Sequence, residues 1–222
     1  MLEQTVSVPV SERLSLEGDL AVPDSPKGVV LFAHGSGSSR HSPRNRYVAG
    51  VLQHSVFATM LVDLLTVSEE RGEAGTGQLR FDIELLAGRL GRVADWLNAG
   101  EQLATRGLPL GYFGASTGAA AALLAAANRA GHVFAVVSRG GRPDLAGDAL
   151  PKVRAATLLV VGSADTQVLE LNRVAFARLD TEKRLEVVPG ATHLFEEPGA
   201  LERVAELAAG WFEGNLAALN VA

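Results

Sequence analysis

The chain of 222 residues contains no cysteine. This absence excludes a disulfide-stabilised scaffold, a thiolate metal site and a cysteine nucleophile. Aromatic residues make up only 5% of the sequence, so its core must consist mainly of alanine, valine and leucine. Basic residues are outnumbered by acidic ones, and the formal net charge is -5. This balance argues against a nucleic-acid partner, because nucleic-acid-binding proteins usually carry a basic footprint.

Long hydrophobic runs are also missing. The longest apolar run, Ala119–Ala127, is far shorter than the roughly 20 residues that a transmembrane helix needs. The first ten residues have no basic region followed by an apolar stretch, which a secretory signal would show. We therefore expect a cytoplasmic protein with no membrane partner. Its oligomeric state is not indicated by the sequence.

The hydrophobic pattern predicts an α/β fold. Residues 13–22 alternate apolar and polar side chains, and residues 5–10 form a suitable antiparallel neighbour with one face in water. Six short apolar runs follow, alternating with helical stretches, as in a parallel sheet covered on both faces. These runs are Gly28–Ala33, Phe57–Val62, Leu108–Phe113, Val133–Val137, Ala156–Val161 and Leu185–Val188.

The expected helices are Tyr47–His54, Arg80–Leu103, Ser116–Arg129, Val168–Leu179 and Ala200–Leu219. Together the elements predict an eight-stranded, mostly parallel sheet in one domain over residues 1–222. No insertion after the sixth strand is long enough to form a cap domain. In such sheets ligands bind at the carboxyl ends of the strands, so the chemistry is expected in the loops that follow them.

The most specific chemical motif is Gly-Ala-Ser-Thr-Gly at residues 114–118. It lies between a predicted buried strand and an alanine-rich helix, the setting of a nucleophile elbow, where glycines permit a sharp turn. Ser116 is then at a helix start, where free N–H groups favour negative charge. The alternative is a serine that only caps the helix. We favour Ser116 as a nucleophile.

A serine nucleophile needs a base, and the base needs an acid that orients it. His193 follows the last strand and is expected beside Ser116, whereas His132 precedes a strand and is expected at the opposite edge. Asp165, directly after the seventh strand, is preferred as the acid over Asp144, which lies farther beyond the sixth. The predicted catalytic residues are Ser116, Asp165 and His193. A buried structural histidine and helix-capping aspartates are the alternatives.

Acyl transfer also needs donors for the developing oxyanion. The N–H of Thr117, the residue after the nucleophile, is one expected donor. The second is expected from the glycine- and serine-rich loop after the third strand, at Ser36 or else at Gly35. His34 in the same loop is expected to brace it rather than to act as a second base.

Several cations follow the third and sixth strands, although the chain is acidic. An arginine fork near the nucleophile would suit a substrate carboxylate or phosphate, and Arg40, His41 and Arg139 are the candidate substrate-binding residues. The alternative is that these cations pair with acids such as Asp82, Glu84 or Asp144, or remain solvated. The polar segment Thr66–Gln78 borders the same edge and is expected to form either a mobile flap or an ordinary exposed loop.

The motifs HGSGSS, GASTG, VGSAD and GATHLF, in this order, resemble those of the α/β-hydrolase superfamily. The stretches RFDIELLAGRLGRVADWL, GYFGASTGAAAALLAAA and VVSRGGRPDLAG make the chain similar to the capless dienelactone-hydrolase-like proteins. Domains of this kind also occur fused to phosphoribosyltransferase domains. Dienelactone hydrolases proper use a cysteine nucleophile, whereas position 116 is serine here. The resemblance therefore implies a serine-type hydrolase but not the lactone substrate of those enzymes.

These features predict an enzyme that cleaves small carboxylic esters or lactones through an acyl-enzyme on Ser116. The predicted mechanism requires no metal and no cofactor, only a small-molecule ester or lactone as partner. Two alternatives remain: a thioesterase or acyltransferase that uses the same three residues, and a non-catalytic binding module with a hydrolase fold.

Overall fold

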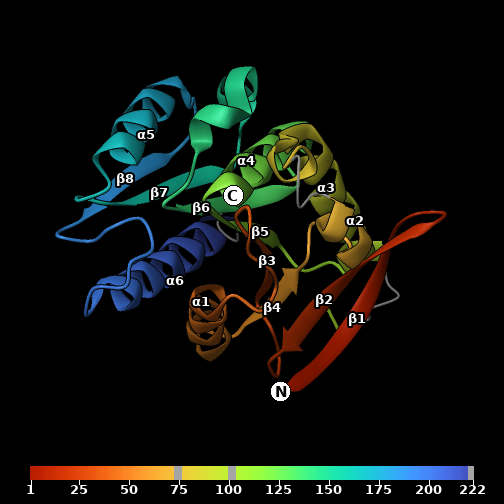
Figure 1. Cartoon of the computed structure of the whole chain (residues 1–222). Coiled ribbons are helices and arrows are strands. Elements are labelled where there is room, and N and C mark those ends of the chain that lie inside the picture. The colour runs from red at the N-terminus through yellow and green to blue at the C-terminus, as the bar shows by residue number, and fades with distance from the viewer. Residues whose placement is uncertain (73–76, 100–103, 220–222) are drawn as a thin grey trace.

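The computed structural model describes residues 1–72, 77–99 and 104–219. In these ranges one sheet of eight strands has the order β1-β2-β4-β3-β5-β6-β7-β8 (Figure 1). Pairs β1–β2 and β2–β4 are antiparallel and the other neighbours are parallel, which confirms the predicted sheet. The strands are β1 Leu2–Ser11, β2 Leu14–Val22, β3 Gly28–Ala33, β4 Phe57–Val62, β5 Leu110–Ala115, β6 Val133–Arg139, β7 Ala156–Gly162 and β8 Lys183–Val188.

Helices cover both faces of this sheet and enclose two apolar clusters. Helices α1 and α6 pack on one face, around buried side chains such as Phe57, Phe113 and Phe212. Helices α3, α4 and α5 and the 3-10 segment η3 cover the other face. The helical bounds are α1 Pro43–His54, α2 Val67–Gly72, η2 Leu79–Phe81, α3 Ile83–Ala99, α4 Thr117–Asn128, η3 Pro143–Lys152, α5 Thr166–Arg178 and α6 Ala200–Leu219.

Several boundaries differ from the predictions for local reasons. Helix α1 begins at Pro43 rather than Tyr47, because the Ser42 side chain accepts a hydrogen bond from the Asn45 N–H and proline suits the first helical turn. Strand β5 begins at Leu110 rather than Leu108, after Pro109, which has no N–H to donate to a ladder. Helix α2 and segment η3 were not predicted. The end of the predicted helix Arg80–Leu103 lies partly outside the described residues.

The sheet aligns the ends of its central strands. Ala33 of β3 pairs with Gly114 of β5, and Ala115 of β5 pairs with Arg139 of β6. The loops after these strands therefore meet above one edge of the sheet. No helix in the described part of the chain has the length and apolarity that crossing a membrane requires.

Candidate active site

The turn between β5 and α4 holds Ser116 in a strained conformation. Ser116 has φ 51° and ψ -123°, in the positive-φ region that side chains other than glycine rarely adopt. Ser116 occupies the N-cap position, but its side chain makes no capping hydrogen bond. The hydroxyl is therefore not used to stabilise the helix, and this favours the nucleophile interpretation over the capping one.

The two glycines of the motif are required by close backbone contacts. A Cβ on Gly114 would lie 2.7 Å from the Ala119 nitrogen, inside the first turn of α4. A Cβ on Gly118 would overlap the carbonyl oxygens of Ala33 and His34. Gly118 thus lets α4 approach the end of β3, which brings the serine turn and the loop after β3 together.

We expect Gly118→Ala to destabilise the protein by about 3 kcal/mol, because the added methyl group meets backbone atoms that cannot rotate away. The free energy of unfolding in urea measures this effect. Gly88→Ala is a matched control on α3, since a Cβ there meets nothing within 4 Å and alanine favours the helix by about 0.5–1 kcal/mol. Equal stability of Gly118→Ala and the parent protein would contradict the packing argument.

His193 and Asp165 form a direct hydrogen bond. The His193 Nδ1 lies 2.7 Å from the Asp165 Oδ2, and the two residues come from the loops after β8 and β7. Asp165 occupies the N-cap position of α5 without a side-chain capping bond, so its carboxylate serves the histidine instead. The rival acid Asp144 accepts two hydrogen bonds from Arg142, at 2.9 and 2.8 Å. His132 is exposed at the start of β6, at the opposite edge.

The end of β6 connects the serine to the histidine. The Ser116 N–H donates to the Arg139 carbonyl at 3.3 Å. The next residue, Gly140, has φ 50°, and a Cβ there would lie 3.1 Å from the His193 carbonyl oxygen and 3.5 Å from its Nδ1. Gly35 approaches from the other side, where a Cβ would lie 2.8 Å from the Ser116 Cβ. The serine turn and the His193 loop therefore border the same strand end.

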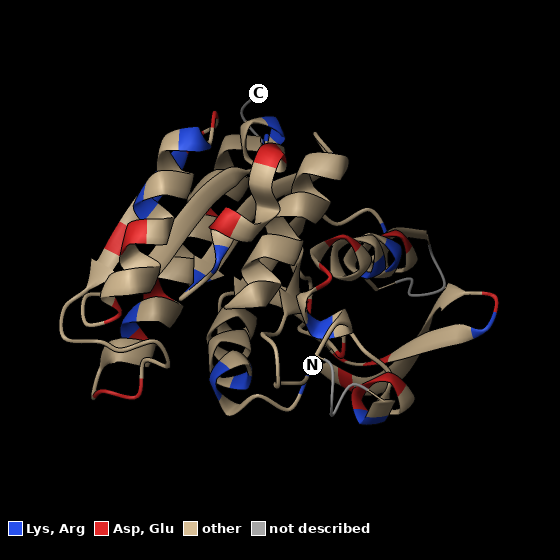
Figure 2. Cartoon of the chain, turned by 45° about the horizontal axis from the view of Figure 1, so that its top comes forward, with Lys and Arg blue, Asp and Glu red and all other residues tan. Residues whose placement is uncertain are grey.

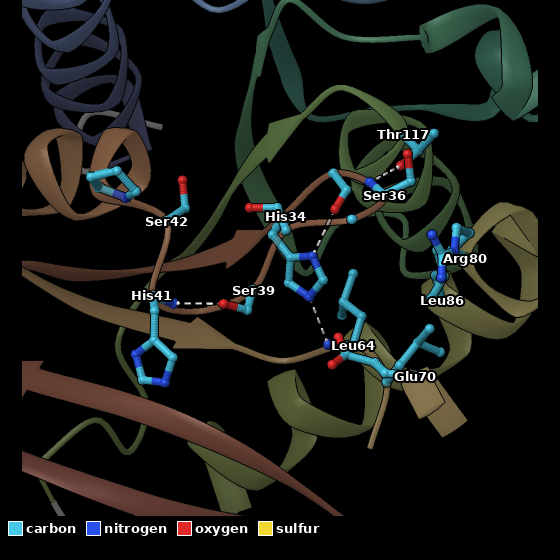
Figure 3. Close-up of a pocket in the computed structure, with 15 residues that line it drawn as sticks. His34, Ser36, Ser39, His41, Ser42, Leu64, Glu70, Arg80, Leu86 and Thr117 are labelled. Carbon is cyan, nitrogen blue, oxygen red and sulfur yellow. Dashed lines mark hydrogen bonds between the residues drawn. The ribbon is translucent and has the colours of Figure 1, made fainter. Parts of the chain in front are cut away.

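The two predicted oxyanion donors differ in their surroundings. The Thr117 N–H belongs to the first turn of α4, where helix N–H groups have no intrahelical acceptor. The Ser36 N–H donates to the Thr117 Oγ1 at 2.9 Å (Figure 3). The Thr117 hydroxyl therefore fixes the loop after β3 against α4, and it must share or release the Ser36 N–H if that group is to bind an oxyanion. The sequence did not indicate this role of the Thr117 side chain.

His34 braces the loop, as predicted. Its Nε2 accepts the Leu64 N–H at 3.0 Å, so Nδ1 carries the proton and donates to the Gly35 carbonyl at 2.9 Å (Figure 3). Burial lowers the pKa of His34, which favours this neutral form. Both ring nitrogens are occupied, and His34 is therefore unsuited to act as a second base.

A cavity of about 550 Å³ opens beside this loop. Its polar wall comes from the loop after β3 and from Thr117, while the loop after β4 and helix α3 supply apolar side chains (Figure 3). The sequence analysis did not assign the lining residues Leu64, Leu65, Arg80 and Leu86 to the site, whereas Glu70 lies in the segment Thr66–Gln78 that it placed at this edge. For Leu64 and Leu65 the available signal was their position directly after β4, whereas Arg80 lies in η2 and Leu86 in α3. Within the described residues no three His, Asp or Glu side chains gather as a metal ion would require.

Solved structures with the same fold provide the decisive comparison. A dienelactone hydrolase from Anabaena variabilis is 57% identical to the chain, with a TM-score of 0.92, over 96% of this chain and 97% of that one. The chain belongs to the dienelactone-hydrolase-like family of α/β-hydrolases. Est1E from Butyrivibrio proteoclasticus covers 96% of this chain with a TM-score of 0.79, but at 15% identity it supports the fold alone.

Sequence comparison adds two relatives and one negative result. Two Mycobacterium tuberculosis proteins, whose names propose a phosphoribosyl transferase activity, are 60% identical over 213 residues. The chain spans about half the length of these curated relatives, since the match covers 46% of each. No family model matches the sequence. The dienelactone hydrolase and esterase structures support a hydrolase that acts on esters or lactones in general.

In this dienelactone-hydrolase-like chain, the cations after β3 are held by acids. Arg40 pairs with Asp63 and also lies 3.4 Å from an Asp19 oxygen. The Arg46 Nη2 lies 3.0 Å from the Asp19 Oδ2 and 2.7 Å from the His41 Nδ1. Arg40 therefore follows the alternative of the sequence analysis, in which the cations pair with acids. Its partners are Asp63 and Asp19, not Asp82, Glu84 or Asp144.

Other charged groups have different surroundings. Arg142 pairs with Asp144, one of the acids that the sequence analysis named as partners of the cations. The Arg44 Nη1 lies 3.1 Å from the Glu196 Oε1. Arg139 is only 7% exposed, and burial together with repulsion from Arg44 lowers the pKa of its guanidinium to about 10. In the view of Figure 2, acidic and basic residues are mixed over the helices rather than gathered by sign.

The predicted flap Thr66–Gln78 begins with an ordered helix. Residues 67–72 form α2, and residues 73–76 lie outside the described residues. Glu69 in α2 accepts a hydrogen bond from the buried Arg89 Nη1 at 2.9 Å and from the Thr66 N–H at 2.8 Å. Burial, the largest single influence, raises the pKa of Glu69. The hydrogen bonds from Arg89 and Thr66 and the charge of Arg89 together outweigh it, so the pKa is lowered. The first part of the segment is therefore anchored to α3.

Proposed function

We propose that this protein is a serine-type carboxylic ester hydrolase, in which Ser116 is the nucleophile, His193 the base and Asp165 the orienting acid. The observation that carries the proposal is the 2.7 Å hydrogen bond between His193 Nδ1 and Asp165, which forms at the same edge of the sheet as the strained Ser116 turn. A serine, histidine and aspartate in these roles perform acyl transfer on several unrelated folds.

The hydrogen bond to Asp165 favours one tautomer of His193. The Nδ1–H donates a hydrogen bond to the carboxylate, which leaves Nε2 as the acceptor for the Ser116 hydroxyl proton. Ser116 then attacks the ester carbonyl, and the Thr117 N–H stabilises the oxyanion together with Ser36 or Gly35. His193 gives its proton to the departing alcohol. A water molecule, deprotonated by His193, releases the acid and restores the serine.

The cavity beside Ser36 and Thr117 suits a small acyl group. At about 550 Å³ it falls in the usual range of small-molecule sites. Leu64, Leu65 and Leu86 offer apolar contact, while the loop after β3 offers hydroxyl groups. The substrate class is therefore a small, partly polar ester or lactone.

A fluorophosphonate probe tests the nucleophile directly. We expect the wild-type protein to be labelled at Ser116, because the probe reacts only with an activated serine. Ser116→Ala is expected to remove the label, and Ser15→Ala, at an exposed position of β2, is expected to retain it. Mass spectrometry of the labelled peptides gives the position. A wild-type protein that stays unlabelled would favour the non-catalytic binding module.

A further inference from the structure

The Thr117 hydroxyl lies at the cavity wall with a proton that it can still donate. Thr117 is only 4% exposed and lines the cavity of about 550 Å³ together with Ser36. Its Oγ1 accepts the Ser36 N–H at 2.9 Å. Within residues 1–72, 77–99 and 104–219 no acceptor receives the proton of this hydroxyl. A buried donor without an acceptor is unfavourable, so a molecule in the cavity has to supply one.

The bond from Ser36 to Thr117 ends a chain of hydrogen bonds that all run in one direction (Figure 3). The Leu64 N–H donates to His34 Nε2 at 3.0 Å, and the His34 Nδ1–H donates to the Gly35 carbonyl at 2.9 Å. That carbonyl and the Ser36 N–H belong to the same trans peptide group, so they point in opposite directions. Hydrogen bonds in such a chain strengthen one another, and the chain therefore polarises the Thr117 hydroxyl.

The Gly35–Ser36 peptide group is fixed by the fold before any substrate binds. The Gly35 carbonyl also accepts the Ser38 N–H at 3.1 Å. The backbone of Gly35 lies so near the nucleophile that a Cβ there would be 2.8 Å from the Ser116 Cβ. Donors that are already oriented stabilise a developing charge well, because they need no reorganisation at the moment of reaction.

His34 keeps the direction of the chain only as a neutral imidazole. A proton on Nε2 would face the Leu64 N–H, and two donors cannot bond to each other. Burial lowers the pKa of His34 and so opposes this protonation. His34 is therefore a positioning residue that orients the peptide group of Gly35 and Ser36.

We propose that the Thr117 hydroxyl is a catalytic donor, which gives a hydrogen bond to the oxyanion while its oxygen still accepts the Ser36 N–H. This inference rests on the proposed ester hydrolysis at Ser116. Thr117 then supplies two oxyanion donors, its N–H and its O–H, and Ser36 acts through the hydroxyl rather than directly. The bond between Ser36 and Thr117 stays intact during the reaction, and the hydroxyl keeps its proton.

Thr117→Val removes the hydroxyl but keeps the branched shape and the backbone N–H. We expect kcat/KM for 4-nitrophenyl acetate to fall about 100-fold, the usual effect of the loss of one oxyanion donor. A phenyl trifluoromethyl ketone, which forms an oxyanion adduct with an active serine, should lose affinity by a similar factor. Thr117→Ser keeps the hydroxyl and is expected to stay within about 10-fold of the wild type, since only a methyl group is lost. Thr117→Ala repeats the test without a methyl group beside the Ser36 N–H.

Thr157→Val is the matched control. Thr157 is also buried and its hydroxyl donates to the Ala155 carbonyl at 2.9 Å, but it lies at the amino end of β7, away from the site. Its replacement should leave kcat/KM unchanged. Wild-type activity in Thr117→Val and Thr117→Ala would overturn the proposal. Higher activity would also overturn it, because the hydroxyl would then be withholding the Ser36 N–H from the oxyanion.

A double-mutant cycle tests the chain behind the hydroxyl. His34→Gln offers an amide oxygen to the Leu64 N–H but lacks the ring Nδ1–H that donates to Gly35. Alone it is expected to lower kcat/KM about 3-fold, through weaker polarisation of the chain. Added to Thr117→Val it should cause no further loss, because both residues act through one hydroxyl. Additive losses would overturn the transmission through Thr117.

The wild-type protein and Ser116→Ala separate this inference from the proposed function. A wild-type protein that neither hydrolyses the ester nor binds the trifluoromethyl ketone would overturn both. Turnover that depends on Ser116 but not on the Thr117 hydroxyl would overturn the role of the hydroxyl and leave the hydrolase proposal intact.

Discussion

Ser116→Ala is expected to lower kcat/KM for a 4-nitrophenyl ester by about 1,000-fold or more, because loss of a triad nucleophile leaves only the contribution of substrate binding and oxyanion stabilisation. The chain has no cysteine that could replace the hydroxyl as nucleophile. The strained backbone at φ 51° is held by the surrounding turn and does not depend on the hydroxyl, which makes no capping bond. Folding should therefore be preserved.

Initial rates of 4-nitrophenolate release, corrected for background hydrolysis, measure this effect. The circular dichroism spectrum and the urea midpoint of the variant should match those of the parent protein. Ser15→Ala on β2 provides a matched substitution at an exposed serine and is expected to have no effect. A Ser116→Ala protein with more than a tenth of the wild-type rate would show that another group attacks the ester.

Asp165→Asn is expected to lower kcat by about 1,000- to 10,000-fold, the range seen when the acid of a triad becomes an amide. The amide can donate to His193 Nδ1, which places the proton on Nε2 and removes the acceptor for Ser116. The loss should therefore appear in kcat rather than in KM. Steady-state kinetics of both proteins at the same pH measure both constants.

Asp144→Asn is the informative control for this variant. Asp144 was the rival acid in the sequence, but it is bound by two hydrogen bonds to Arg142. Its replacement should change kcat by less than about 10-fold, because a partly exposed ion pair contributes little. If Asp144→Asn inactivated the enzyme and Asp165→Asn did not, the assignment of the acid would be reversed.

Strand positions were predicted well where the hydrophobic pattern is continuous. The bounds of β3, β4 and α6 agree with the sequence prediction, since buried strands and a long amphipathic helix have strong local patterns. Helix α2 was missed because its six residues, VSEERG, carry no apolar stripe and depend on the contact of Glu69 with Arg89. Segment η3 was missed because Pro143 and Pro151 interrupt any regular helical pattern.

The sequence prediction named candidate site residues but not the contacts that they make. The sequence placed the serine, the histidine and two candidate aspartates after strand ends, because strand order and glycine-rich turns are visible in the chain. It grouped Arg40, His41 and Arg139 as one cationic set. The structure ties Arg40 to Asp63 and Asp19, while Arg139 has no such partner among the described residues.

The sequence by itself determined the fold class, the absence of a thiol nucleophile and the strand-end positions of Ser116, Asp165 and His193. These properties depend on composition and on patterns between near neighbours. Only the tertiary structure decided that Asp165 rather than Asp144 bonds to His193, and that the Ser36 N–H is held by Thr117. Such contacts join residues far apart in the chain, and the direction of each side chain is set by packing that no local pattern encodes.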